Sequence, residues 1–406
     1  MSLFNHKARL WVDGRKGIFE KVKKAINPEE KIAWIHCASL GEFEQGRPVI
    51  EALKKEIPEL KIFLTFFSPS GFEVRKNYTG ADYIFYLPHD SKKNARLLIN
   101  LVKPQFVVFV KYEFWYYYLS ELHNDNIPAY LISAIFRKNQ VFFKWYGEWY
   151  RNMLFFFRHI FVQDNDSLLI LNKEGITNVT VAGDTRFDRV FNVSMNTRTI
   201  PDLEKFCDGK FTVVAGSTWQ KDDELLAGWF MNSPEDLKLI IAPHEIHESR
   251  ISWLEKQFEG RTIRFSKLNS EINSIVHTVL IIDNIGMLSS VYRYGKIAYI
   301  GGGFGKGIHN ILEAATFGLP VIFGPNFSNF REACELINLG GASSISNIQE
   351  LKKILDQMIL SYDLLKKQSL VSGKYVQSNI GATKIIMDII TEFKQDPDAK
   401  DNNMTV

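Results

Sequence analysis

Short apolar runs, rich in β-branched and aromatic residues, alternate with helix-like stretches along most of this chain. In the first half these runs are KIAWIHCA, KIFLTFF, ADYIFYL, QFVVFVK, PAYLISA, HIFVQD and VTVAG. The second half repeats the rhythm with FTVVAGS, LKLIIAP, TVLIID, KIAYIGGG and LPVIFG. Strands that are apolar throughout, with helices between them, are typical of parallel sheets covered by helices on both faces. The pattern therefore predicts an α/β protein.

The 406 residues are enough for two or three domains, since a domain usually has about 100–200 residues. Between the two sets of strands lies a polar segment, 192–210, that has no convincing periodicity. We place the domain boundary near 198, which predicts two Rossmann-like domains, 1–198 and 199–406, whose parallel sheets face an interdomain cleft. The helix-like stretch 382–394 follows the last strand and is expected to pack back on the first domain.

Charge and cysteine content exclude several classes of protein. Lys and Arg number 49 against 46 Asp and Glu, a net charge of +3, which is too balanced for a surface built to bind nucleic acid. The three cysteines lie far apart without a CxxC pair, so neither a disulfide framework nor a zinc site is indicated. No apolar run reaches the 18 or so residues of a membrane span.

The first loop that can carry chemistry follows the strand expected at 32–38. Ligands of open α/β sheets sit beyond the carboxyl ends of the strands, so strand-to-helix loops are the places to search. Here Ser39 can cap the next helix and Gly41 allows a tight turn, which puts Glu42 at the mouth of the cleft. A carboxylate in a first helical turn is ordinarily only a favourable contact with the helix dipole, so the loop alone leaves both interpretations open.

The second loop, within 299–325, is rich in glycine. Its glycines leave backbone N–H groups free to approach a phosphate, and the following helix adds its positive end; they are Gly301, Gly302, Gly303, Gly305 and Gly307. The spacing matches neither GxGxxG followed by an acidic residue nor GxxxxGK[ST], so nicotinamide and P-loop sites are both disfavoured. Glu313, one turn beyond His309 and Asn310, is placed to accept hydrogen bonds from a ribose diol.

Two further strand-to-helix loops, 213–224 and 240–248, end in polar turns. In the first, the acidic run reads as the solvated start of a helix: Asp222, Asp223 and Glu224. In the second, His244 and His247 have an HxxH spacing without a third ligand at fixed spacing, so we expect no metal.

Residues 1–26 and 136–158 combine basic side chains with aromatic ones. Basic heads attract anionic lipid, and aromatic rings settle at the headgroup level, so both stretches suit a membrane surface. A helix that covers the core and reaches solvent with its Lys and Arg heads explains the composition equally well. The basic residues of the second stretch that we expect on a membrane surface are Lys138, Lys144, Arg151 and Arg158.

At these loops the sequence resembles the 3-deoxy-D-manno-octulosonic acid (Kdo) transferases of lipopolysaccharide synthesis, which have the GT-B glycosyltransferase fold. The similarity runs from about Leu3 to the last helix. Its most telling pieces are HCASLGEFEQGRP, YLPHD, EFW, GDTRFD, AGST, DNIGML, GGG followed by GIHNILE, and GPNFSNF. The resemblance implies an inverting enzyme that transfers Kdo from CMP-Kdo to a lipid A precursor and needs no cofactor or metal.

The resemblance also implies roles for particular residues. Glu42 matches the family's general base, Arg186 falls on its transition-state lysine, and Glu113 matches the last acid of its ETELWP motif. The implied CMP contacts are Pro243, His244, Ile285, Gly286, Met287, Asn310, Ile311, Leu312 and Glu313. The donor and acceptor loops would add Ser39, Gly41, Ser217, Thr218, Gly302 and His309.

The sequence departs from the family pattern at three positions. His244 stands where the family usually has Arg, and a neutral imidazole is a poorer phosphate partner. Met287 replaces a Glu, so only its backbone is expected to face the cytidine. Lys111 replaces the first acid of the ETELWP motif, and three tyrosines follow Trp115 where proline and asparagine are usual.

Two other functions remain open at this point. One is a GT-B enzyme that uses a UDP-sugar, such as a lipid-A-disaccharide synthase or an epimerase. The other is a non-catalytic protein that binds glycan or membrane. The resemblance places the protein at the cytoplasmic face of the bacterial inner membrane, on its anionic surface, either peripherally or through an N-terminal anchor that the printed chain does not contain.

Overall fold

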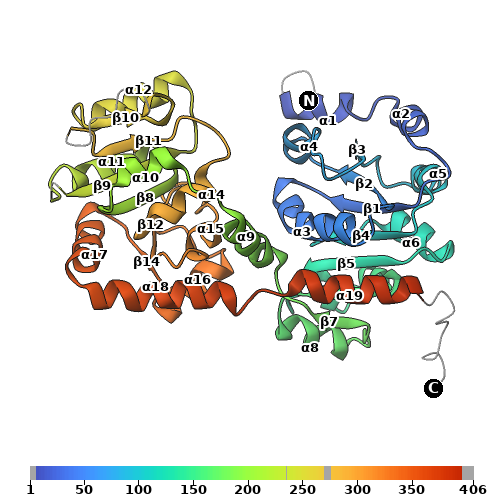
Figure 1. The fold of residues 1–406 in the computed structure, drawn as a ribbon. Coiled ribbons are helices and arrows are strands. Elements are labelled where there is room, and N and C mark those ends of the chain that lie inside the picture. Colours follow the sequence, from blue (N-terminus) through green and yellow to red (C-terminus); the bar gives the residue numbers. More distant parts are fainter. Residues whose placement is uncertain (1–5, 235, 269–275, 396–406) are drawn as a thin grey trace. The chain divides into compact units, whose positions relative to one another are not determined.

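The computed structural model describes residues 6–234, 236–268 and 276–395. The chain forms two compact units, which we describe separately (Figure 1). Unit 1 comprises residues up to Asp188 and those from Ile380 onward, and unit 2 runs from Arg189 to Asn379. The division falls inside helix α9 (Thr185–Asn196), before the boundary expected near 198.

Unit 1 contains a seven-stranded parallel sheet in the order β3-β2-β1-β4-β5-β6-β7. Its strands are β1 (Ile32–Cys37), β2 (Lys61–Phe66), β3 (Tyr83–Tyr86), β4 (Phe106–Val110), β5 (Ala129–Ala134), β6 (His159–Val162) and β7 (Val179–Val181). Its longer helices are α1 (His6–Asp13), α2 (Ile18–Ala25), α3 (Leu40–Glu56), α4 (Pro69–Arg75), α5 (Lys92–Val102), α6 (Tyr116–Asn124) and α8 (Asn165–Lys173). Apolar side chains of β1, β2 and β4 are buried on both faces of this sheet, as expected for continuous apolar strands.

The last helix, α19 (Ala382–Gln395), packs on α3 and belongs to unit 1. Its Ile386, Met387 and Ile390 lie in the same apolar cluster as Val49 and Leu53 of α3. At its start, the backbone N–H groups of residues 381 and 383 donate to the Asp188 carboxylate at 2.5 and 2.6 Å. A carboxylate at a helix N-terminus satisfies donors that the helix itself leaves unpaired.

Unit 2 contains a second seven-stranded parallel sheet, in the order β10-β11-β9-β8-β12-β13-β14. Its strands are β8 (Phe211–Thr218), β9 (Leu237–Pro243), β10 (Thr262–Arg264), β11 (Val279–Ile281), β12 (Ile297–Ile300), β13 (Val321–Phe323) and β14 (Ala342–Ser344). Its helices include α10 (Pro201–Cys207), α11 (Gln220–Phe230), α12 (Glu248–Gln257), α14 (Leu288–Val291), α15 (Leu312–Ala315), α16 (Arg331–Leu339), α17 (Ile348–Leu360) and α18 (Tyr362–Gln377). The predicted α/β class with two parallel sheets is confirmed.

Parallel strands bring all the strand-to-helix loops of a unit to one edge of its sheet. In unit 1 this edge carries the loops after β1 and β4, which are neighbours in the sheet. In unit 2 it carries the loops after the adjacent strands β11, β9, β8 and β12. Across 6–234, 236–268 and 276–395, no helix combines the length and the apolar character that crossing a bilayer requires.

Candidate functional site

Glu42 lies in the first turn of α3, directly after β1. Ser39 is the N-cap of this helix, and its side-chain oxygen accepts from the backbone N–H of Gly41 at 3.2 Å. The Ser39 hydroxyl in turn donates to the Glu42 carboxylate. The cap thus orients the half-buried Glu42 at the carboxyl edge of the sheet.

Glu113 follows β4 and is 8% exposed. Its Oε2 accepts from Trp115 Nε1 at 2.6 Å and lies 3.1 Å from His36 Nε2. Burial, with smaller contributions from Glu42 and Glu113, raises the pKa of the Cys37 thiol well above its ordinary value. The loops of two neighbouring strands therefore bring Glu42 and Glu113 to one edge of the sheet.

Arg186 lies in the first turn of α9, within unit 1. Its guanidinium pairs with the buried Asp184 at 2.7 Å, and Asp184 also accepts from Gln45 Nε2 of α3 at 3.3 Å. Thr185 Oγ1 donates to the backbone oxygen of Gln45 at 2.5 Å. These contacts dock the GDTRFD loop on the helix that carries Glu42. We did not predict Asp184 or Gln45 from the sequence, although Asp184 belongs to the quoted motif.

Asp222 of α11 holds the glycine-rich turn after β12 in place by a hydrogen bond. This carboxylate accepts from the backbone N–H groups of Gly302 and Trp219, both at 2.9 Å, and from the Tyr299 hydroxyl at 2.7 Å. Only glycine fits at Gly301, because a Cβ there would lie 2.3 Å from the backbone oxygen of Ser217. The turn is therefore bound to the start of α11 through Asp222 and lies closely against the end of β8 at Gly301.

The prediction of a solvated acidic helix start was wrong for two of its three residues. Asp222 is 1% exposed and Asp223 is fully buried, whereas Glu224 is exposed. Asp223 forms an ion pair with Arg250 of α12. Burial nevertheless raises the pKa of Asp223 to about 7. Sequence reasoning missed this because the partners Tyr299, Gly302 and Arg250 are remote in the chain.

Three rings from three loops stack at the same edge of unit 2. Trp219 Nε1 donates to His309 Nε2 at 3.1 Å. The ring of His244 stacks on Trp219 and on His309, with both centroid distances 4.5 Å. Trp219 Nε1 and His309 Nε2 are too close for a third ring to fit between them. The His244 ring therefore lies over both of these side chains. Burial, aided by His244, lowers the pKa of His309 to about 4, which keeps this imidazole neutral.

The remaining residue of the HxxH pair has a different role. His247 is the N-cap of α12, and its Nδ1 accepts from the backbone N–H of Arg250 at 3.2 Å. His244 and His247 thus make separate contacts, one with rings and one with a helix end.

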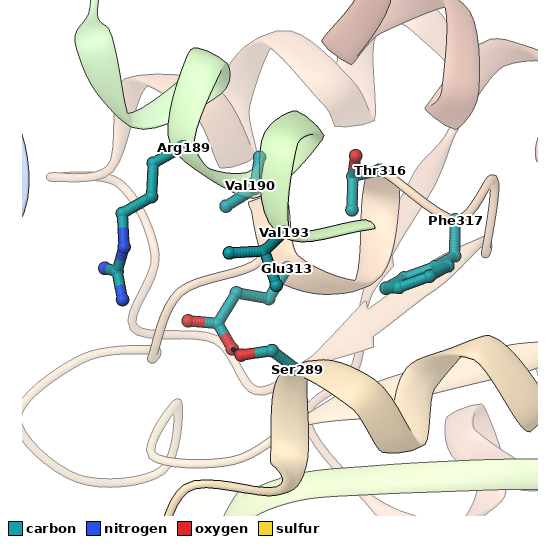
Figure 2. Close-up of a pocket in the computed structure, with 7 residues that line it drawn as sticks. All are labelled: Arg189, Val190, Val193, Ser289, Glu313, Thr316 and Phe317. Atoms are coloured by element: carbon teal, nitrogen blue, oxygen red, sulfur yellow. Dashed lines mark hydrogen bonds between the residues drawn. The ribbon is translucent and has the colours of Figure 1, made fainter. Parts of the chain in front are cut away.

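Glu313 of α15 lines a small open pocket in unit 2 (Figure 2). Its two carboxylate oxygens accept from Ser289 Oγ at 2.8 Å and from Asn310 Nδ2 at 3.2 Å. Figure 2 shows Glu313 and Ser289 pointing toward each other, with Arg189 nearby. The other lining residues are Val190, Val193, Thr316 and Phe317. A helix-borne carboxylate in such a pocket can still accept from the hydroxyls of a ligand.

The other predicted donor contacts lie in neighbouring loops of unit 2. Ile285 is 87% exposed, and Gly286 has a φ of 93°, in the left-handed region that favours glycine. The side chains of Ile311 and Leu312 are fully buried, so only their backbone can meet a ligand. The rest lie at strand or helix ends: Ser217 and Thr218 end β8, Pro243 ends β9, and Met287 precedes α14.

Residues 136–158 do not form one helix. They fold into a short 3-10 turn (Val141–Phe143), α7 (Glu148–Asn152) and a second 3-10 turn (Met153–Phe156). One set of apolar side chains is buried: Phe136, Phe142, Met153, Leu154 and Phe157. Another is exposed: Trp145 at 93%, Tyr146 at 61%, Trp149 at 51%, Phe155 at 50% and Tyr150 at 41%. We call the second set the aromatic patch.

The basic residues near the aromatic patch differ in their surroundings. Lys138 and Arg158 are exposed and Lys144 is half-buried. Arg151, in contrast, pairs with Glu174 at 2.9 Å. In the other basic stretch, Arg15 lies over the ring of Trp11 and donates to backbone oxygens of residues 67 and 87, both at 2.8 Å. Part of the basic charge that the sequence shows is thus engaged within unit 1.

Solved structures with a similar fold are known. A UDP-GlcNAc 2-epimerase from Neisseria meningitidis bound to UDP-GlcNAc has a TM-score of 0.61 at 17% identity, covering 89% of this chain and 100% of the other. MurG of Acinetobacter baumannii has a TM-score of 0.55 at 11% identity, covering 89% and 99%. At these identities the similarity concerns the fold alone, which is GT-B.

Sequence comparison is more specific. Residues 12–189 match the family model of 3-deoxy-D-manno-octulosonic-acid (Kdo) transferases. The Kdo transferase of Aquifex aeolicus is 27% identical over 351 residues, covering 84% of this chain and 91% of the relative. That of Haemophilus influenzae is 25% identical over 383 residues, covering 90% and 88%. Glu42, Glu113 and Arg186 all lie within the segment that matches the Kdo transferase family, and this match together with the relatives indicates that the chain is a glycosyltransferase.

Proposed function

We propose that this protein transfers Kdo from CMP-Kdo to a lipid A precursor, lipid IVA, in lipopolysaccharide synthesis. The observation that supports this most is the position of Glu42. It lies within the segment that matches the Kdo transferase family, at the carboxyl edge of the sheet, and a capping serine orients it. A general base for an incoming sugar hydroxyl needs that placement.

The reaction requires one site that stabilises the negative charge of the leaving phosphate and another that accepts a proton from the incoming hydroxyl. The leaving CMP needs its phosphate stabilised, which the glycine-rich turn of unit 2 can do with backbone N–H groups. The incoming hydroxyl needs a base, which we assign to Glu42. Glu113 would stabilise positive charge on the reacting sugar, whereas Arg186, bound to Asp184 in this structure, would stabilise negative charge. A single displacement inverts the anomeric carbon.

Mass spectrometry tests the proposal directly. The protein is incubated with lipid IVA and CMP-Kdo, which is generated in the same reaction, and the product should gain the mass of at least one Kdo unit. Calorimetry with CMP and UDP addresses the second candidate, a UDP-sugar enzyme with the same fold as the UDP-GlcNAc 2-epimerase compared above. Binding of CMP in preference to UDP supports the transferase, and the reverse preference contradicts it.

Replacing Glu313 with alanine is expected to weaken CMP binding by about 10- to 100-fold. We assign this carboxylate to the ribose hydroxyls, and a hydrogen bond to a charged group contributes roughly 1.5–3 kcal/mol. Titration calorimetry with CMP measures the effect. Glu350→Ala, which changes another first-turn glutamate of the same unit, should leave CMP affinity unchanged. An unchanged dissociation constant in Glu313→Ala would show that the ribose is held elsewhere.

We further propose that unit 1 lies on the anionic surface of the inner membrane through the aromatic patch, as an amphiphilic acceptor requires. Exposed tryptophans and tyrosines partition to the headgroup region, and each nearby Lys or Arg adds about 1 kcal/mol. The structure changes the choice of residues for a test. Arg151 pairs with Glu174, so reversing its charge would also destabilise unit 1.

The combined variant Trp145→Ser, Lys138→Glu and Lys144→Glu is therefore expected to lose most binding to anionic vesicles, with CMP affinity and melting temperature unchanged. Co-sedimentation at low and high salt measures binding. The control Lys92→Glu and Lys93→Glu reverses two exposed charges on α5 of the same unit, and it should bind vesicles better than the patch variant. Equal binding by wild type and the patch variant would contradict the assignment.

A further inference from the structure

A series of buried hydrogen bonds crosses three neighbouring strands of unit 1 and ends on Glu113. Trp34 Nε1 donates to Thr65 Oγ1 at 2.8 Å, and His36 Nδ1 lies 2.9 Å from the same oxygen. On its other side, His36 Nε2 lies 3.1 Å from Glu113 Oε2. The sheet places these groups together, because β1 pairs His36 with Thr65 of β2 and with Phe109 of β4.

The protons can be placed from which of these groups can donate a hydrogen bond and which can accept one. An indole N–H can only donate, so Thr65 Oγ1 accepts from Trp34. The Thr65 hydroxyl is fully buried, and in the described part of the chain its other hydrogen-bond partner is His36 Nδ1. Because a buried hydroxyl that does not donate is costly, Thr65 donates to a bare Nδ1. His36 is then neutral and carries its proton on Nε2.

Two N–H donors consequently meet on one oxygen of Glu113. His36 Nε2 and Trp115 Nε1 both donate to Oε2. Within the described residues, no hydrogen bond ends on Oε1. An oxygen that receives two N–H donors is typical of an ionised carboxylate. Its second oxygen remains available to a ligand.

We propose that His36, fixed by Thr65, is a positioning residue that holds Glu113 as a carboxylate with Oε1 presented to the reacting sugar. The proposal rests on the proposed function, in which the anomeric carbon becomes positive as CMP leaves. The protonation state of His36 matters because an imidazolium beside Glu113 would cancel the charge that stabilises this carbon. A neutral His36 leaves the pair negative, and the bond from Thr65 favours that state.

The proton positions can be measured without any substrate. Nitrogen-15 NMR of the labelled full chain reports which imidazole nitrogen carries a proton, and the His36 signals are assigned by their loss in His36→Gln. We expect a protonated Nε2 and a bare Nδ1 at neutral pH. A proton on Nδ1, alone or together with one on Nε2, would overturn the proposal.

Two matched substitutions test the positioning role. Glutamine can place its amide nitrogen near the position of Nε2 and donate to Glu113, whereas asparagine reaches only the position of Nδ1. We expect His36→Asn to lower kcat by about 10- to 100-fold, the effect of one hydrogen bond to a charged group. We expect little change in the KM for CMP-Kdo, and we expect His36→Gln to restore most of the rate.

The same pair of variants in a Glu113→Ala background separates positioning from a structural role. If His36 acts through Glu113, the difference between the asparagine and glutamine variants disappears there. An undiminished difference would overturn the proposal, and melting curves check that all variants fold. Should a variant fail to fold, the NMR result on the wild type decides. Absence of Kdo transfer by the wild type would instead contradict the proposed function and leave the NMR result standing.

Discussion

Replacing Glu42 with glutamine is expected to reduce Kdo transfer by ~10²–10⁴-fold, the usual contribution of a general base. The amide keeps the shape of the side chain but cannot take the proton of the acceptor hydroxyl. Ser39, which donates to Glu42, can still donate to the amide oxygen, so the cap of α3 should persist. The rate is measured as Kdo-labelled product formed per unit time at saturating donor and acceptor.

A matched control lies on the same helix. Glu51 of α3 is exposed and pairs with Arg47, and Glu51→Gln should leave the rate unchanged because a surface ion pair contributes little. Glu42→Gln should also bind CMP with wild-type affinity, since we assign CMP to loops of unit 2. Transfer by Glu42→Gln within a few-fold of wild type would rule out Glu42 as the base.

Replacing Asp222 with alanine is expected to cost at least ~3 kcal/mol in the free energy of unfolding. The carboxylate accepts from Gly302, Trp219 and Tyr299, and each buried donor left unpaired costs about 1–3 kcal/mol. For a unit of this size the melting temperature should fall by roughly 6–12 °C. CMP affinity should fall as well, because the glycine-rich turn loses the group that holds it.

Glu224→Ala provides the comparison for Asp222→Ala. Glu224 lies on the same helix but is exposed, so its loss should change the free energy of unfolding by less than about 0.5 kcal/mol. Calorimetric melting of both variants, with and without CMP, measures stability and binding together. Equal melting temperatures for the two variants would show that Asp222 does not hold the turn.

Local patterns in the sequence were sufficient to predict the fold class of this protein and the loops that carry its contiguous motifs. The apolar runs predict the strands and their parallel arrangement, because a strand buried on both faces has no polar alternation. The position of Glu42 after Ser39 follows from a helix cap, which involves residues only three apart. The glycine-rich turn and Glu313 were found for the same reason, since their signals are contiguous.

Only the tertiary structure decided which distant residues meet. Asp222 looks solvated in the sequence, yet it is buried and accepts hydrogen bonds from Tyr299 of β12 and from Gly302 in the turn after that strand. His36 acquires its partners from β2 and from the loop after β4, far along the chain. The aromatic residues of 136–158 divide into buried and exposed sets because two 3-10 turns and the short helix α7 replace a single helix there. Burial and hydrogen-bond partners depend on packing between elements, and local composition does not encode that packing.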